Sequence, residues 1–307
     1  MRDCIYVVLA LLCVSAIDGV CVKTDMIIAV IVNHGFVPFA INLHLHTQRF
    51  VPPLHSILYI ALDEEGYHEM YKYGLNTIHD DSSAIRQTFT KVGTFFRDTP
   101  YNHIVLHKWR ISYWLLNKFQ RAVMILDADV VFLRNPLFYL MDIPTCDLTV
   151  TVESFSMPTL LNFNAATQYQ GDNHNIWMNT GLMLWQYTRN SIDTITTFLD
   201  PSFRLNSDDQ NEFNKFVSSQ VQPESGSRPK WNRCVRMAYP KMNTNSSGIF
   251  SLHVLPPPLF GSQQYIYAGL VGACMGDYIS PYFIHFNFIS GFEAKKKRMI
   301  EKGVWLL

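Results

Sequence analysis

The sequence predicts an α/β fold built on a doubly wound, mostly parallel β-sheet, and three apolar segments are the basis of this prediction. Residues 26–32, 56–61 and 123–126 are short apolar runs of the kind that form strands buried on both faces. Helical patterning lies between them, at 39–50 and within 82–118. Strands that alternate with helices pair in parallel through crossover connections. A chain of 307 residues with 48% hydrophobic content can form one large core, so we predict a single domain.

The second half of the chain continues this alternation. Its predicted elements are, in order, strands at 148–152 and 177–185, helices at 189–199 and 208–217, a strand at 281–289 and a short basic helix at 293–302. Two polar stretches, 153–175 and 220–233, are predicted loops. The first is Asn-rich and long for a simple connection, so we expect it to serve a function, such as a lid or an acceptor wall.

The composition favours a sugar-binding protein over a nucleic-acid-binding one. Lys plus Arg and Asp plus Glu each number 25, so the formal net charge is zero and the chain lacks the basic field that phosphate backbones require. Charged residues make up only 16% of the chain, which is below the usual share, whereas aromatic residues make up 14%. Clefts lined by aromatic rings suit sugars, which present apolar ring faces as well as hydroxyl groups.

The amino-terminal residues are typical of a targeting signal. Arg2 precedes an apolar run at 4–17, and small residues then offer a cleavage site. The run is shorter than the roughly 20 apolar residues of a membrane-spanning helix. We interpret residues 1–22 as a cleaved signal peptide, with a short signal anchor as the alternative, and 23–307 as the folded domain. In either case we expect the domain to face the lumen of the ER or Golgi, and to be secreted if the signal is cleaved.

The cysteines and one glycosylation triplet agree with a secretory location. Cleavage in the predicted place would leave Cys21, Cys146, Cys234 and Cys274, which are far apart and lack the CxxC spacing of a metal site. We expect one or two disulfides, with Cys234–Cys274 as the favoured pair. Asn245 begins an N-glycosylation triplet in a polar stretch, as in a lumenal glycoprotein.

The most specific motif is a pair of carboxylates, Asp127 and Asp129, at the end of the predicted strand 123–126. In open α/β sheets, ligands bind beyond the carboxyl ends of the strands. Two oxygen ligands there suit a hard divalent cation that neutralises the charge on a departing nucleoside diphosphate. An Asp at a strand end is also common in turns and helix caps, so the pair alone does not establish a metal site. The following run, F-L-R-N-P-L at 132–137, favours the metal interpretation.

The segment L-D-A-D-V-V-F-L-R-N-P-L at 126–137 resembles the nucleotide-diphospho-sugar transferase domain of glycosyltransferase family 77, and it is close in pattern to family 8, the glycogenin group. Both groups have the GT-A fold, a Rossmann-like mixed sheet. Further segments follow in the family's order over most of residues 26–302: I-A-L-D at 60–63, Lys108, N-T-G-L-M at 179–183, Asp209-Gln210 with Asn214, and His285-x-Asn287 with Gly291 and Lys295. The resemblance therefore implies a GT-A glycosyltransferase.

The resemblance implies a metal centre next to a diphosphate site. Asp127 and Asp129 would hold Mn2+ or Mg2+, with Asp129 the stronger direct ligand and Asp127 nearer the ribose, and His285 would complete the site. A histidine on an apolar strand is otherwise more often a packed core residue, so this role follows from the resemblance alone. Gly291 would let the backbone approach the diphosphate, and Lys295 would pair with it. In family 8 the lysine comes sooner after its glycine, which leaves the neighbouring lysine as an alternative.

The resemblance also implies contacts to the nucleoside and the sugar of a donor. Asp63 would accept hydrogen bonds from the base or ribose, although a strand-end turn explains it almost equally well. Lys108 would contact phosphate or, alternatively, an acidic neighbour. The small Gly181 would leave room for the sugar ring beside Asn179. The remaining implied donor-binding residues are Ala128 and Asn287.

Asp209 and Gln210 are the candidate catalytic residues. Their carboxylate and amide would read sugar hydroxyls or face the anomeric carbon, with a helix N-cap pair as the alternative interpretation. The resemblance implies retention of the anomeric configuration. One route is front-face attack, in which the leaving phosphate helps to remove the acceptor's proton; the other needs a protein nucleophile, and Asp209 is the carboxylate we nominate for it.

The sequence thus predicts a lumenal, metal-dependent hexosyl- or pentosyltransferase that moves a sugar from a nucleotide-diphosphate donor, with a UDP-sugar favoured, to a glycan or glycoprotein acceptor. Galactose, xylose, arabinose and glucose all remain open as the donor sugar. The alternative is a non-catalytic lumenal carbohydrate- or nucleotide-sugar-binding protein on the same fold. A sugar-1-phosphate nucleotidyltransferase would need a Gly-rich phosphate loop after the first strand, and N-H-G-F-V-P at 33–38 is not one. A glycosidase would not need this Asp-x-Asp context.

Overall fold

The fold is known from a computed structural model that describes most of the chain. The described residues are 26–50, 57–80, 99–154, 177–200, 209–218, 234–240, 247–256, 259–262, 281–287, 289 and 291–307. The predicted signal segment, Asn245, Cys274 and nearly all of the two predicted loops lie outside these residues. Among the described helices, none combines the length and the apolar character needed to cross a membrane.

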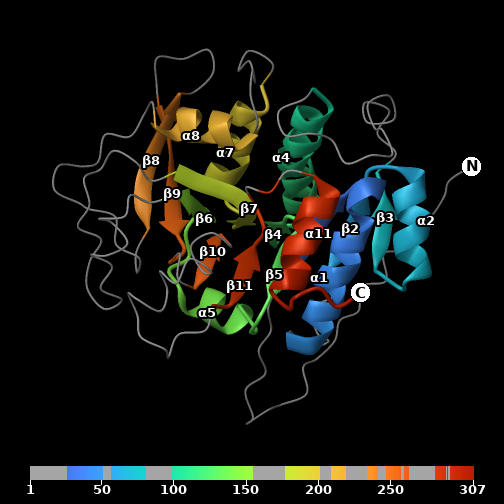
Figure 1. The fold of residues 1–307 in the computed structure, drawn as a ribbon. Coiled ribbons are helices and arrows are strands. Elements are labelled where there is room, and N and C mark those ends of the chain that lie inside the picture. Colours follow the sequence, from blue (N-terminus) through green and yellow to red (C-terminus); the bar gives the residue numbers. More distant parts are fainter. Residues whose placement is uncertain are drawn as a thin grey trace, which may run out of the picture.

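Within the described residues, eight strands form one mixed sheet in the order β3-β2-β1-β4-β7-β6-β9-β8 (Figure 1). These strands are β1 (Met26–Val32), β2 (Leu58–Ala61), β3 (Thr77–His79), β4 (Ala122–Leu126), β6 (Leu148–Ser154), β7 (Trp177–Trp185), β8 (Val235–Pro240) and β9 (Ser247–Val254). β1 pairs in parallel with both β2 and β4, which confirms the predicted parallel core of the sheet. β7 runs antiparallel to β4, so the sheet is mixed at its centre.

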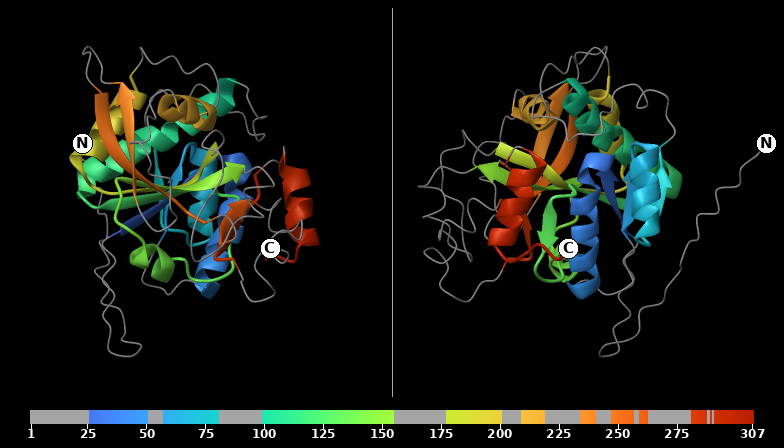
Figure 2. Two further views of the ribbon diagram at one scale, coloured as in Figure 1. Left: turned by 90° about the vertical axis from the view of Figure 1, so that its left-hand side faces the viewer. Right: turned by 45° about the vertical axis from the view of Figure 1, so that its right-hand side comes forward.

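Helices cover both faces of this sheet (Figures 1 and 2). α4 (Thr99–Phe119), α7 (Arg189–Phe198) and α8 (Asp209–Ser218) pack on one face, around the buried Trp109, Phe198 and Phe213. The other face carries the 3-10 helix η1 (His34–Phe36) and the helices α1 (Val37–Phe50), α2 (Glu64–Lys72), α5 (Leu137–Asp142) and α11 (Phe292–Glu301). Alternate residues of each central strand enter opposite clusters, which is why those strands read as unbroken apolar runs.

A second, smaller sheet of the described chain has the order β10-β11-β5 and lies on the α1 side of the molecule. Its strands are β5 (Val130–Phe132), β10 (Phe260–Ser262) and β11 (Phe283–His285). β5 follows β4 after a three-residue turn, so the turn joins the two sheets. The antiparallel register of β11 on β5 places His285 opposite Val130, next to Asp129.

The structure confirms the predicted strands and helices in kind and shifts several of their limits. The strand predicted at 281–289 is paired only over Phe283–His285, because the partner strands β5 and β10 are equally short. The helix expected within 82–118 is described from Thr99 onward. The sequence patterns missed eight of the described elements: η1, β3, β5, β8, β9, β10, α2 and α5. Most of the missed strands have three residues or lie in the antiparallel half of the sheet.

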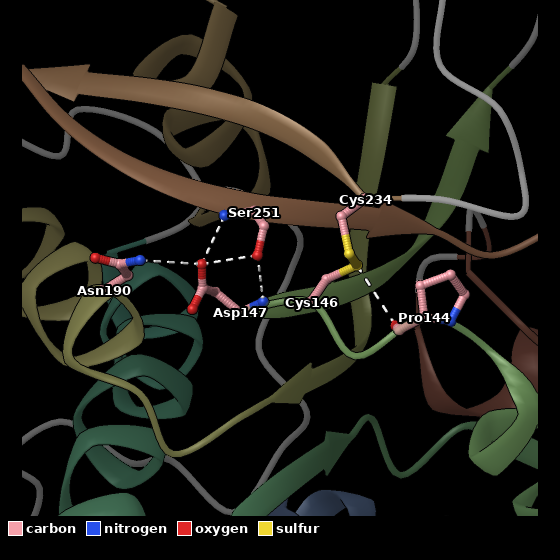
Figure 3. Close-up of a disulfide and its surroundings, with 6 residues drawn as sticks. All are labelled: Pro144, Cys146, Asp147, Asn190, Cys234 and Ser251. Carbon is pink, nitrogen blue, oxygen red and sulfur yellow. Dashed lines mark hydrogen bonds between the residues drawn. A yellow bond between two sulfur atoms is a disulfide. The ribbon is translucent and has the colours of Figure 1, made fainter.

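The predicted disulfide partner of Cys234 was wrong. Cys234 pairs with Cys146, with the two Cα atoms 5.7 Å apart (Figure 3). The strands explain the pairing, because Cys146 precedes β6 and Cys234 precedes β8, and the first residues of both strands lie opposite Leu252 of β9. Beside the disulfide, the Asp147 carboxylate accepts hydrogen bonds from the Ser251 backbone N–H (2.7 Å) and hydroxyl (2.8 Å), which fixes β6 against β9.

Candidate metal centre and donor site

The turn between β4 and β5 brings Asp127 and Asp129 to the carboxyl edge of the parallel strands. The backbone N–H of Asp127 donates to the Gly181 carbonyl (3.0 Å), which ties one end of the turn to β7. The Phe286 N–H donates to the Asp129 carbonyl (3.1 Å), which ties the other end to the residue after β11. The motif therefore sits where a ligand of an open α/β sheet is expected, held from both sheets.

His285 completes a cluster of three potential metal ligands. Its Nε2 lies 3.5 Å from Asp127 Oδ2 and 3.2 Å from Asp129 Oδ1. One ligand atom from each residue lies within 4.8 Å of the other two, and this is the one such cluster of three or more ligand-type residues found among the described residues. The structure thus brings together all three residues of the predicted metal centre.

Two lysines orient the carboxylates of this cluster. Lys108 of α4 donates to Asp127 Oδ1 (3.0 Å), and Lys295 of α11 donates to Asp129 Oδ2. One oxygen of each carboxylate is therefore paired with an ammonium group, and the other oxygen is turned toward His285. Of the two sequence interpretations of Lys108, the acidic neighbour is the one that the structure shows.

Asp129 remains ionised although it is buried. Burial alone would raise the pKa of its carboxyl, but the neighbouring charges of Lys295 and His285 and their hydrogen bonds outweigh this effect and hold the pKa well below its usual range. A permanently charged carboxylate is what a divalent cation needs as a ligand. Two carboxylate oxygens and an imidazole nitrogen that face one another fit Mn2+ or Mg2+ in ligand type. Asp127, Asp129 and His285 could therefore hold such an ion.

Gly181 is required by the position of His285. A Cβ atom built at residue 181 would lie 2.2 Å from His285 Cε1 and 2.5 Å from His285 Nδ1, well inside van der Waals contact. The imidazole therefore lies where a Cβ atom of residue 181 would be, and the expectation that Gly181 leaves room for a donor's sugar ring stays a prediction. The absence of a side chain at Gly181 allows the His285 ring to approach β7 closely.

Asn179, two residues earlier on β7, contacts the same imidazole. Its Oδ1 accepts a hydrogen bond from the Gly181 backbone N–H (2.7 Å) and lies 3.1 Å from His285 Nδ1. Thr151 of β6 donates its hydroxyl to the Asn179 carbonyl (3.2 Å). The described contacts of Asn179 thus run to the metal centre, whereas the sequence interpretation placed this residue against the donor sugar.

α8 is fixed to the same strand by amide side chains. Gln210 Oε1 accepts from the Thr180 N–H (3.3 Å), so the candidate catalytic amide reaches the edge of the cluster. Asn214 bonds both backbone groups of Met178, accepting from its N–H (2.8 Å) and donating to its carbonyl (2.9 Å). Asp209 is the first residue of α8, and its side chain lies outside the described residues.

Most of the chain matches the model of a known protein family. Residues 53–299 match the model described as nucleotide-diphospho-sugar transferase. The chain belongs to this family. The matched range contains Asp63, Lys108, the Asp-x-Asp turn, His285 and Lys295.

Solved structures show that this transferase has the GT-A fold. The galactosyltransferase LgtC in complex with donor and acceptor sugar analogues matches with a TM-score of 0.50 and 10% identity, over 85% of this chain and 86% of that one. Mouse xyloside xylosyltransferase 1 in its apo form matches with a TM-score of 0.50 and 15% identity, over 87% of this chain and 99% of that one. GlyE of Streptococcus pneumoniae matches more weakly, with a TM-score of 0.48 and 11% identity over 93% of this chain. This chain spans 61% of the length of GlyE. A comparison with curated protein sequences gave no match.

Both carboxylate oxygens of Asp63 in this transferase accept hydrogen bonds from backbone N–H groups. Its Oδ1 accepts from the Gly66 N–H (2.7 Å) as the N-cap of α2, and its Oδ2 accepts from the His34 N–H (2.8 Å) in the turn after β1. Both oxygens therefore hold the edge of the sheet together. A nucleoside would have to share this carboxylate with two backbone N–H groups.

Gly291 and Asn287 both have features that a ligand-binding segment would explain. Gly291 is the N-cap residue of α11 with φ 88° and ψ 145°, a conformation that residues with a side chain rarely adopt. Asn287 buries both atoms of its side-chain amide, and neither has a hydrogen-bond partner. Buried amides in native proteins are almost always paired, so this one fits a residue that bonds a ligand. Ala128 is buried inside the Asp-x-Asp turn.

Asn33 is the candidate that the sequence interpretation missed. It follows β1 at the carboxyl edge of the sheet and is buried, and its Nδ2 has no hydrogen-bond partner. In the sequence, N-H-G at 33–35 directly follows the predicted strand 26–32. The available signal was the position itself, since a polar residue directly after the first parallel strand faces the same edge as Asp127.

Proposed function

We propose that this transferase is a metal-dependent, retaining glycosyltransferase of family 77 that moves a sugar from a UDP-sugar to a glycan or glycoprotein acceptor. The convergence of Asp127, Asp129 and His285 between two lysines is the observation that supports the proposal. A bound Mn2+ or Mg2+ would stabilise the negative charge that develops on the departing diphosphate.

The chain's own residues supply the rest of the proposed mechanism. Lys295, in the first turns of α11, lies beside Asp129 and would pair with a donor phosphate. The amino-terminal end of α11 favours negative charge, and Gly291 leaves open space in front of it. The buried, unpaired Nδ2 of Asn33 and the buried, unpaired amide of Asn287 would form hydrogen bonds with the nucleotide. Asp209 is the carboxylate that a double-displacement route would use, and the front-face route needs none.

A donor screen tests this proposal. The full chain is incubated with a panel of nucleotide sugars and Mn2+, and the released nucleotide is measured. We expect metal-dependent release with a UDP-sugar, and a loss of about 100-fold or more in Asp129→Asn, since Lewis-acid stabilisation is worth several kcal/mol. Asp142→Asn is the matched control, because Asp142 is an exposed carboxylate at the end of α5. Undiminished release by Asp129→Asn would refute the metal assignment, and binding without turnover would favour the non-catalytic alternative.

We also propose a location in the secretory pathway, with residues 1–22 as a cleaved signal peptide or short Golgi anchor and 23–307 as the lumenal domain. The Cys146–Cys234 disulfide supports an oxidising compartment. Amino-terminal sequencing of the protein from culture medium and from membranes tests this directly. A mature end near residue 22 is expected, and an intact Met1 on the membrane-bound form would identify an anchor. An intact Met1 on a cytosolic form would contradict the proposal.

A further inference from the structure

The hydrogen bonds of Asn179 determine which nitrogen of His285 carries a hydrogen. A backbone N–H can only donate, so the Gly181 N–H identifies the atom 2.7 Å away as the amide oxygen of Asn179. The same oxygen lies 3.1 Å from His285 Nδ1. Because an amide oxygen can only accept, Nδ1 must be the donor in this contact. The tautomer of His285 is therefore read from a neighbouring backbone group.

The consequence for the imidazole lies on its opposite side. A histidine that ligates a metal is neutral and has one N–H, and with this hydrogen on Nδ1 the lone pair is on Nε2. Nε2 is the atom that faces Asp127 Oδ2 at 3.5 Å and Asp129 Oδ1 at 3.2 Å. In the other tautomer, the Nδ1 lone pair would point at the Asn179 oxygen and the metal-facing nitrogen would be blocked by a hydrogen.

Burial makes this preference strong. Asn179 and His285 are 3% and 6% exposed, so water does not readily replace the contact if it is lost. An unpaired buried polar group costs about 1–3 kcal/mol, so the Nδ1–H···Asn179 contact is expected to persist both when Nε2 faces a cation and when, without one, Nε2 donates a hydrogen to the Asp129 carboxylate. Thr151 supports the amide from β6, through its hydroxyl bond to the Asn179 carbonyl. Gly181 favours the same contact, because the absence of a Cβ lets the His285 ring approach β7.

We propose that Asn179 is a positioning residue that acts through His285: it holds the imidazole in the Nδ1–H tautomer and keeps Nε2 open to a divalent cation. The inference depends on the proposed metal-dependent function. It assigns Asn179 to the metal centre instead of the donor sugar. The side-chain oxygen already bonds the Gly181 N–H and the His285 ring, which leaves it poorly placed to accept a hydrogen bond from a sugar hydroxyl.

A pair of variants separates this role from a merely structural one. Asn179→Leu keeps the approximate volume and removes the acceptor, whereas Asn179→Asp keeps an acceptor oxygen in place. The first readout is whether Nδ1 of His285 carries a hydrogen in the metal-free full chain, from 15N NMR of histidine-labelled protein, which also distinguishes a ring with hydrogens on both nitrogens. His285→Gln assigns the signal among the 11 histidines. The second readout is Mn2+ affinity without donor, from an electron paramagnetic resonance titration.

We expect the wild type and Asn179→Asp to show a hydrogen on Nδ1, and Asn179→Leu to lose this preference. Mn2+ affinity should fall about 10–100-fold in Asn179→Leu and by much less in Asn179→Asp, as for other groups that orient metal-bound histidines. If Asn179→Leu does not fold, Asn179→Ala also removes the acceptor and gives the same comparison with a smaller side chain.

Unchanged tautomer and Mn2+ affinity in the leucine variant, with a raised KM for the donor alone, would overturn the inference and return Asn179 to the sugar site. Failure of the proposed function is distinguishable from this result. A wild type that binds no Mn2+ refutes the metal-dependent function, while the metal-free NMR comparison still decides whether Asn179 sets the tautomer.

Discussion

A methyl group at position 181 is expected to displace His285 and so to weaken metal binding. In Gly181→Ala, the new Cβ would lie 2.2 Å from His285 Cε1 and 2.8 Å from Asn179 Oδ1. Ordinary contact between carbon atoms begins at about 3.5 Å, so the imidazole must retreat by about 1.3 Å. The backbone cannot follow easily, because β11 is paired on both sides, with β10 and β5.

A displacement of this size removes Nε2 from the metal centre. Metal–ligand distances hold to within about 0.2 Å, several times less than the required shift. We expect Mn2+ affinity, measured by paramagnetic resonance titration, to fall by about 10–100-fold or more. A loss of this size is typical when a metal-bound histidine loses the hydrogen-bond partner that orients it. Overpacking also costs about 1–3 kcal/mol, so thermal unfolding must show that the variant is folded under the assay conditions.

A double-mutant cycle with His285→Ala tests whether the effect passes through the ring. If it does, Gly181→Ala lowers the Mn2+ affinity of the wild type and has little further effect once the imidazole is absent. Wild-type affinity in Gly181→Ala, or an equal loss in both backgrounds, would refute the reasoning from the 2.2 Å contact.

The disulfide and a buried histidine give two further predictions. Replacing Cys146 and Cys234 together by Ser should lower the free energy of unfolding by about 2–4 kcal/mol, because the bond closes a loop across a sequence separation of 88 residues. Urea unfolding with and without reductant checks this, and a double variant as stable as the oxidised wild type would contradict it. Burial lowers the pKa of His46, so the stability that its neutral form provides is complete above the unfolded value of about 6.5 and declines as the pH falls below it. His46→Gln should therefore lose less stability than the wild type on acidification, measured by urea midpoints across that range; an equal or larger loss would refute the assignment.

Local pattern was sufficient for the centre of the fold. β1, β2 and β4 were predictable because each is buried on both faces and reads as an apolar run, and their parallel pairing followed from the helices between them. The Asp-x-Asp pair was predictable as a site because it follows β4 directly. β5 and β10 were not predictable, because a three-residue strand has no period to detect and exists only through its pairing with β11.

Long-range partners were the part of the site that the sequence could not supply. Asn179 and His285 are 106 residues apart, and only the pairing of β7 with β4 and of β11 with β5 brings them together. The resemblance to a known family named both residues, but their hydrogen-bond contact comes from the structure alone. Cys234 shows the same limit, since its partner was decided by the strand order β6-β9-β8 and not by spacing along the chain.

Under the proposed function, charge balance explains why the metal and the donor should raise each other's affinity. The carboxylates of Asp127 and Asp129 are already paired with Lys108 and Lys295, and Asp129 and both lysines are largely buried. A dication added alone would leave this pocket with uncompensated positive charge, at a desolvation cost that ion pairing must offset. A diphosphate brings the missing negative charge and gives Lys295 a second anion to contact. Each ligand therefore raises the affinity of the other, and linkage requires that it does so by the same factor.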